Sequence, residues 1–203
     1  MLKCRGELSL VLLILLTGCT SEGDPSGPAP PGSIDFQLVN YLNVSPGFNN
    51  GKTVRFRSNT IPVHVGEGVE DFEELTIWTT VSNGIIQFNF VSVPSSEGIL
   101  IQLGRTGPGI CATTSMFRFG DDGSIQQATI TLGPLYNNPS FCRNTIAHEV
   151  GHAIGIFPHT ADGGLMDFDG GNGQVTEPVA TAITYIYSVP PSTDLTPLVI
   201  PGF

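Results

Sequence analysis

Basic residues are scarce in this sequence. Its 203 residues include 8 lysines and arginines against 18 aspartates and glutamates, which gives a formal net charge of −10 at pH 7. A protein that binds nucleic acid neutralises phosphates with a basic patch, and this composition supplies none. We therefore expect no nucleic-acid partner, and we attribute most of the acidic surplus to the solubility of an exported protein.

Long apolar runs are also missing. Residues 8–16 are apolar apart from Ser9, and they follow Lys3 and Arg5. A run of this length is too short to span a bilayer, which takes about 20 residues. A basic start followed by a short apolar run is typical of a secretory signal. The sequence thus predicts export, without a spanning helix in this region.

The end of this run, Leu16-Thr17-Gly18-Cys19, resembles the lipobox of bacterial lipoproteins. The resemblance implies a signal peptide at residues 1–18, lipidation of Cys19, and a protein anchored to a membrane at the cell envelope or surface. Residues 19–33 are rich in Gly, Pro and Ser, which predicts a flexible tether. Residues 34–203 are sufficient for a single domain with its own core. The alternative is an ordinary signal peptide that leaves Cys19 as a thiol.

Histidine is rare, with 4 in the chain, yet three of them lie within residues 148–159. On a helix, His148 and His152 would share one face with about 5–6 Å between their Cβ atoms. Both rings could then reach a single ion at about 2.0–2.1 Å. Glu149 would be rotated about 100° around the axis, where it can reach water beside a metal. The alternative is a buried helix whose histidines are satisfied by hydrogen bonds.

Two residues mark the end of this helix. Gly155 stands where a helix ends in a left-handed residue, and Pro158 prevents the helix from resuming. His159 follows directly and is the candidate third ligand. Glu177, further along the chain, is the alternative third ligand.

With these residues the sequence resembles the metzincin clan of zinc endopeptidases, and within it the matrixin-like members. The signature of that clan is His-Glu-x-x-His-x-x-Gly-x-x-His, followed by a turn that contains methionine. His148, Glu149, His152 and Gly155 match it, and residues 163–167 look like the turn. The connection from Gly155 to the third histidine has one residue more than is usual in the family.

The resemblance implies a function and a site. Zn²⁺ would be held by His148, His152 and His159, Glu149 would be the general base, and Met166 would form a hydrophobic floor under the metal. The protein would then be a zinc endopeptidase and a monomer. Two alternatives remain open: a gluzincin-type peptidase that uses Glu177, and a non-catalytic lipoprotein that binds a partner at the surface.

The resemblance also implies an α+β fold, with a mixed twisted sheet of about five strands, three main helices and a zinc site between two subdomains. It covers about residues 60–187. Periodicity predicts strands at residues 61–65, 85–91, 98–103 and 127–132. In the family, the last of these is the sheet edge along which a peptide substrate pairs. Residues 34–39 and 53–56 are strand-like as well, without an assigned function.

Helices are predicted in three places. Phe72, Leu75, Trp78 and Val81 recur at helical spacing. Asn138 and Pro139 supply a cap and a first-turn proline for the metal-binding helix, which would run to Ile154. Residues 177–189 follow the candidate cap Thr176 and precede a proline pair.

The remaining candidates are cysteines, acidic loops and one histidine. Cys111 and Cys142 form an even pair in an exported protein, which predicts a disulfide. Cys111 lies in the long connection 105–123, which corresponds in position to the matrixin S-loop but lacks its histidines. Residues 121–123 and 167–171 are acidic and Gly-rich, so they are candidates for calcium binding or for solvated turns. His64 alternates with buried strand positions and is predicted to be a strand residue.

Overall fold

A computed structural model of the chain describes residues 34–195. The predicted signal peptide, the predicted tether and Cys19 lie outside the described residues, so these assignments remain predictions. Among the helices of residues 34–195, none has the length and apolarity needed to cross a bilayer.

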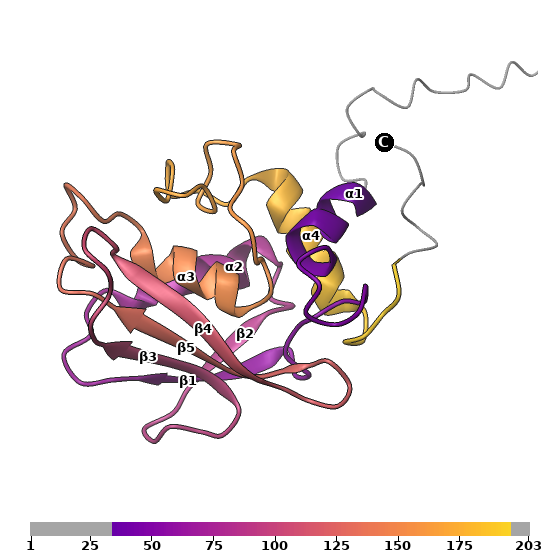
Figure 1. Cartoon of the computed structure of the whole chain (residues 1–203), viewed down its shortest axis with the longest axis horizontal. Coiled ribbons are helices and arrows are strands. Elements are labelled where there is room, and N and C mark those ends of the chain that lie inside the picture. Colours follow the sequence, from indigo (N-terminus) through magenta and orange to yellow (C-terminus); the bar gives the residue numbers. More distant parts are fainter. Residues whose placement is uncertain (1–33, 196–203) are drawn as a thin grey trace, which may run out of the picture. The chain divides into compact units, whose positions relative to one another are not determined.

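A five-stranded mixed sheet forms one layer of the domain (Figure 1). The strand order is β2-β1-β3-β5-β4, in which β4 alone runs antiparallel to its neighbour. The bounds are β1 Thr60–Val65, β2 Gln87–Phe90, β3 Gly98–Leu103, β4 Ala112–Phe119 and β5 Ile125–Leu132. This confirms the predicted α+β class with a mixed sheet of about five strands.

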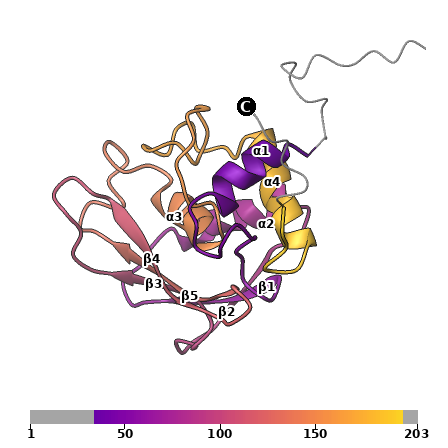
Figure 2. The ribbon, with the colours of Figure 1, turned by 45° about the vertical axis from the view of Figure 1, so that its right-hand side comes forward.

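The helices lie on one side of this sheet (Figures 1 and 2). Helix α3 packs on β4 and β5 and also contacts α2, whereas α1 and α4 lie side by side. The described residues contain four α-helices, α1 Phe36–Val39, α2 Ile77–Val81, α3 Thr145–Ala153 and α4 Glu177–Ser188. A π-helical turn, Asn40–Val44, continues α1, and a 3-10 helix, Phe72–Thr76, leads into α2.

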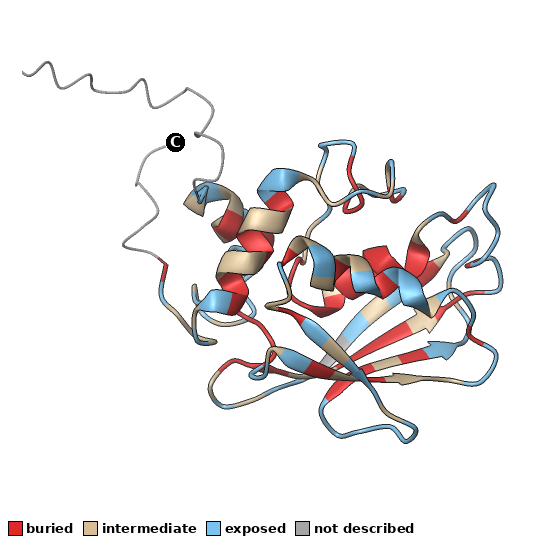
Figure 3. Ribbon diagram, turned by 180° about the vertical axis from the view of Figure 1, so that it is seen from behind, coloured by how far each residue is buried: buried red, intermediate tan, exposed pale blue. Residues whose placement is uncertain are grey.

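The core lies between the sheet and α3 (Figure 3). Ile61 and Val63, alternating residues of β1, are fully buried, and Ile146 and Val150 of α3 are 1% and 0% exposed. His64 stands on the other face of β1, where its Nδ1 lies 3.2 Å from the carbonyl oxygen of Val91. It is therefore a strand residue, as the alternation predicts.

The strand prediction for residues 34–39 is wrong. The carboxylate of Asp35 accepts hydrogen bonds from the backbone N–H groups of Gln37 and Leu38, at 2.9 and 3.1 Å, which is a helix N-cap. Val39 and Leu42 are fully buried, and the ring of Phe36 packs edge-on against Tyr185 of α4. Packing against α4 therefore decides in favour of a helix here. None of residues 53–56 belongs to a strand, and within this range only Phe56 makes a β-bridge, with Ile125.

The metal-binding helix starts later than predicted. The carbonyl of Asn138 accepts from Phe141 and Cys142 in a turn, at 2.9 and 2.7 Å, and Asn144 takes a left-handed conformation with φ 51°. A residue with positive φ cannot continue a right-handed helix, so α3 begins at Thr145. At its other end α3 stops at Ala153, and Gly155 has φ 116°.

The predicted sheet edge is also wrong. Residues 112–119, expected to be part of a long connection, form β4, which pairs from Ala112 opposite Leu132 to Phe119 opposite Ile125. A turn closed by Gly120 N donating to Ser124 O, at 2.8 Å, reverses the chain between β4 and β5. Strand β5 is therefore interior, and β4 is the edge. Local composition could not reveal this, because strand order depends on pairing between segments.

Candidate metal centre

Three histidines converge at the C-terminal half of α3 and the connection that follows it. The Nε2 atom of His152 lies 3.1 Å from that of His148 and 3.3 Å from that of His159, and the three ligand atoms all lie within 4.8 Å of one another. Tetrahedral zinc with Zn–N bonds of about 2.0–2.1 Å needs nitrogens about 3.3–3.4 Å apart. The three rings can therefore hold one metal ion, and the donor set fits zinc.

Glu177 is not part of this group. It is exposed at the first residue of α4, and within residues 34–195 the three histidines are the only cluster of potential metal ligands. Of the two candidates for a third ligand, it is His159 that lies close to the two histidines of α3.

Backbone carbonyls orient two of the rings. The Nδ1 of His148 lies 2.8 Å from the oxygen of Leu165, and the Nδ1 of His152 lies 2.6 Å from the oxygen of Ile156. A carbonyl oxygen only accepts, so each Nδ1 carries the proton and each neutral ring presents a lone pair at Nε2. Two such lone pairs facing each other are satisfied by a cation between them.

Burial keeps these rings neutral. It lowers the pKa of His148, His159 and His152. Burial and the neighbouring histidines together bring the pKa of His152 to about 4. The neutral ring is the form that binds a metal. All three histidines are therefore in the ligand form at neutral pH.

The lowered pKa of His152 can be tested by titration. In the metal-free protein, we expect the ring signals of His152 to show no titration between pH 7 and pH 5 and a midpoint at about pH 4. Because a lowered pKa reduces the competition between protons and metal, zinc affinity should begin to fall at a lower pH than for histidines with the ordinary pKa of about 6.5. NMR titration of the histidine rings, with zinc affinity measured in parallel, checks this. A His152 midpoint near 6.5 would contradict it.

Glu149 lies next to His148 on α3 and is 8% exposed. The hydroxyl of Thr114 on β4 lies 2.6 Å from its Oε2 and 3.0 Å from its backbone oxygen. Burial raises the pKa of Glu149, while the Thr114 hydroxyl and the nearby His159 lower it. A buried carboxyl with a raised pKa, held against the edge strand, suits proton transfer.

Met166 packs beneath the helix turn that carries the first two histidines. It is 1% exposed, and a Cβ atom at Gly151 would overlap its Sδ and would lie 2.6 Å from Cζ2 of Trp78. Trp78 also donates from Nε1 to the carbonyl of Ala147 at 2.8 Å. Gly151 is thus required between the two histidines, because a larger residue would displace Met166 and Trp78.

The acidic loops are organised by their own hydrogen bonds. Asp167 accepts from Thr160 and from the N–H groups of Asp162 and Gly163, at 2.9–3.0 Å. Asp122 accepts from Ser124 and forms an ion pair with Arg57 at 2.9 Å. Within the described residues, neither loop brings three His, Cys, Asp or Glu side chains within reach of one ion.

The structure contains the predicted disulfide. Cys111, just before β4, and Cys142, just before α3, are bonded with their Cα atoms 5.7 Å apart. The bond joins the edge strand to the segment that leads into α3. It therefore ties together the two elements that carry Thr114 and Glu149.

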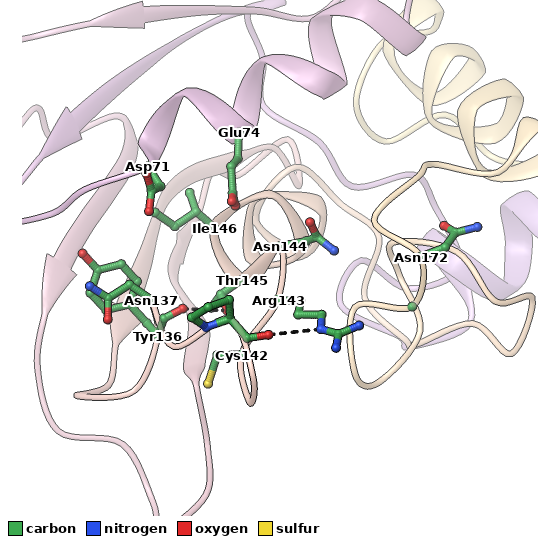
Figure 4. Close-up of a pocket in the computed structure, with 12 residues that line it drawn as sticks. Asp71, Glu74, Tyr136, Asn137, Cys142, Arg143, Asn144, Thr145, Ile146 and Asn172 are labelled. Atoms are coloured by element: carbon green, nitrogen blue, oxygen red, sulfur yellow. Dashed lines mark hydrogen bonds between the residues drawn. The ribbon is translucent and has the colours of Figure 1, made fainter.

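A pocket of about 530 Å³ opens at the N-terminal end of α3 (Figure 4). Asp71 and Glu74 approach it from the 3-10 helix side, while Arg143 and Asn144 precede α3 and Asn172 comes from the loop after Met166. None of the three histidines lines it. This pocket could not be predicted from the sequence, because its lining residues come from distant segments of the chain.

Sequence reasoning found the three histidines, Glu149, Gly155 and Met166, and it missed their supports. These are the carbonyls of Leu165 and Ile156, the hydroxyl of Thr114 and the space at Gly151. Backbone carbonyls leave no trace in side-chain identity. Only Gly151 could have been singled out from the sequence, because a glycine inside a helix is costly relative to alanine and needs a packing reason.

No protein-family model matches this sequence, and a search of curated proteins returns no match.

Proposed function

We propose that this protein is a zinc endopeptidase of the metzincin clan, nearest to the matrixins. One observation carries the proposal: three histidines bring their Nε2 atoms within 4.8 Å of one another, and a buried carboxylate, Glu149, lies on the same helix as two of them. Three histidines leave the fourth position of a tetrahedral ion open, as in catalytic zinc sites. A purely structural zinc site would be closed by a fourth protein ligand.

The chain's own residues supply the proton chemistry. A bound zinc ion would lower the pKa of water and polarise the scissile carbonyl. Glu149 takes a proton from the attacking water and later passes it to the leaving amine. The Thr114 hydroxyl holds Oε2 of Glu149 at 2.6 Å, so that the other carboxylate oxygen is presented to the reacting water.

The substrate would be an extended peptide paired with β4. Strand β4 lies at the sheet edge, and an edge strand offers free N–H and C=O groups to an added strand. Thr114 belongs to β4 and touches Glu149, so a peptide laid along this edge passes beside the general base. Residues 127–132, first expected to play this part, are interior in β5.

Phe168 favours a matrixin-like site over an astacin- or serralysin-like one. It stands two residues after Met166, where those other members have a tyrosine that reaches the metal. Its ring is 85% exposed and packs edge-on against His159, with the ring centroids 5.2 Å apart. A phenyl group has no atom that ligates zinc, so the first coordination sphere retains its three histidines.

The function is tested by incubating the purified protein with casein or gelatin. We expect cleavage that a chelator abolishes and that zinc restores. Stoichiometric zinc without any cleavage would refute the peptidase and leave a metal-bearing binding lipoprotein. Absence of zinc from the folded protein would refute the metal centre itself.

The proposed location is a membrane surface, with the monomer anchored through a lipid on Cys19. We expect Cys19→Ala to move the protein from the membrane fraction to the soluble exported fraction, because the variant lacks the thiol that would carry the lipid. Fractionation with immunodetection measures this, and Cys4→Ala, within the predicted signal peptide, is the matched control. Unchanged membrane association of Cys19→Ala would overturn the lipoprotein assignment.

A further inference from the structure

An N-terminal segment, residues 35–45, contacts the connection between the second and third histidines. Three hydrogen bonds join them, from Asn43 Nδ2 to Gly155 O at 2.7 Å, from Phe157 N to Leu42 O at 2.9 Å, and from Tyr41 Oη to His159 O at 3.1 Å. Successive residues of the segment thus bind alternate residues of the connection. The contacts extend from the end of α3 to the third histidine.

Asn43 anchors this contact. Its side chain is fully buried, and besides Gly155 it binds both polar groups of the Val54 backbone, donating to the oxygen at 2.7 Å and accepting from the nitrogen at 2.8 Å. Carbonyls only accept and the amide N–H only donates, so these partners determine which way the side-chain amide points. Without Asn43, three buried backbone groups would lose their partner.

Gly155 is shaped to receive Asn43. A Cβ atom at this residue would lie 2.7 Å from Val54 O and 2.9 Å from Asn43 Nδ2, and its φ is 116°. The glycine therefore serves two purposes, a left-handed exit from α3 and close contact with the N-terminal segment. This fixes the start of the connection.

Two metal-binding rings depend on the path of this connection. Its Ile156 lies between the two residues held by Asn43 and Leu42, and the Ile156 carbonyl accepts from Nδ1 of His152 at 2.6 Å. Its far end is His159, whose backbone oxygen is held by Tyr41. The same contacts stabilise a connection one residue longer than in the family that the sequence resembles.

The N-terminal segment is itself firmly held. Val39 and Leu42 are fully buried, and α1 packs on α4 through Phe36 and Tyr185, whose ring centroids are 5.3 Å apart. It can therefore act as a fixed support for the connection.

We propose that Asn43 and Tyr41 are positioning residues of the metal centre, which hold the connection that orients His152 and His159. The inference rests on the zinc site of the proposed function but not on peptidase activity. Outer-shell partners of metal ligands commonly contribute about 10–100-fold to metal affinity. Zinc affinity therefore depends on a segment more than a hundred residues away in sequence.

Zinc affinity of two variants of the full chain tests the proposal. In competition with a chromophoric chelator, we expect Asn43→Ala to weaken zinc binding by about 10–100-fold. Tyr41→Phe keeps a ring that is 48% exposed and removes one hydrogen bond, so we expect about a two- to tenfold loss. The absorption spectrum of bound Co²⁺ should change more in Asn43→Ala than in Tyr41→Phe, because the spectrum reports the arrangement of the ligands.

Ser82→Ala is the matched control for lost stability. Its hydroxyl is fully buried and bonds to Thr79 and Ile86 at the end of α2, away from the connection, so zinc affinity should stay at the wild-type value. If Asn43→Ala folds and binds zinc no more weakly than Ser82→Ala, the proposal is wrong. If Asn43→Ala does not fold, Tyr41→Phe decides, and wild-type affinity in that variant overturns the proposal. Failure of the wild-type protein to bind zinc would instead refute the proposed function.

Discussion

Replacing Glu149 with glutamine is expected to lower the rate of peptide hydrolysis by about 10²–10⁴-fold, the usual contribution of a general acid–base group. Glutamine has nearly the same volume and still accepts a hydrogen bond from Thr114, so the helix and the histidines stay in place. It cannot take a proton from water at neutral pH. We therefore expect kcat to fall while KM and bound zinc remain close to the wild-type values.

The measurement combines a fluorogenic peptide assay with metal analysis of the same preparation. Glu177→Gln is the matched control, since Glu177 is exposed on α4 and does not belong to the histidine cluster. It should keep both zinc and activity. If Glu149→Gln retains its zinc and hydrolyses peptide at the wild-type rate, Glu149 is not the general base.

Replacing His159 with alanine is expected to weaken zinc binding by more than the about 10–100-fold typical of an outer-shell partner, because a direct ligand is lost. Peptidase activity should disappear with the metal. The fold should tolerate the change, since His159 is exposed and its backbone oxygen still accepts from Tyr41. Equilibrium competition with a chelator gives the zinc affinity, and circular dichroism confirms the fold.

The comparison with Glu177→Ala separates two candidate ligand sets. We expect Glu177→Ala to bind zinc as tightly as the wild-type protein, because Glu177 lies outside the histidine cluster. The opposite pattern, with zinc retained by His159→Ala and lost by Glu177→Ala, would assign the third ligand to Glu177. That result would also contradict the inference that Tyr41 and Asn43 position the third ligand through the connection.

Elements with strong local signals were predicted well. The alternation in residues 61–65 matches β1, the helical spacing of Leu75 and Trp78 matches the 3-10 helix and α2, and residues 98–103 coincide with β3. In each case the buried face is defined by neighbours within a few residues, which is what periodicity measures. The boundary of α3 was predicted less well, because the left-handed Asn144 and the turn at Asn138 carry no composition signal strong enough to oppose a capping motif.

The order of the strands could not be predicted. Residues 112–119 were expected to be part of a long connection, which left residues 127–132 as the predicted sheet edge. The antiparallel pairing of β4 with β5, and the parallel pairing of β5 with β3, place β5 inside. This choice matters for the proposed function, because it brings Thr114 to Glu149 and makes β4 the edge strand along which we propose that a peptide binds.

By itself, the sequence determined the residues of the candidate metal centre. Helical spacing alone puts His148 and His152 on one face with Glu149 beside them, and Gly155 with Pro158 ends the helix before His159. Only the tertiary structure decided that His159 and not Glu177 completes the cluster, that Thr114 holds the carboxylate, and that residues 41–43 hold the connection. The reason is physical: helix geometry relates residues a few positions apart, whereas the other contacts join segments that meet only when the sheet and the helices pack.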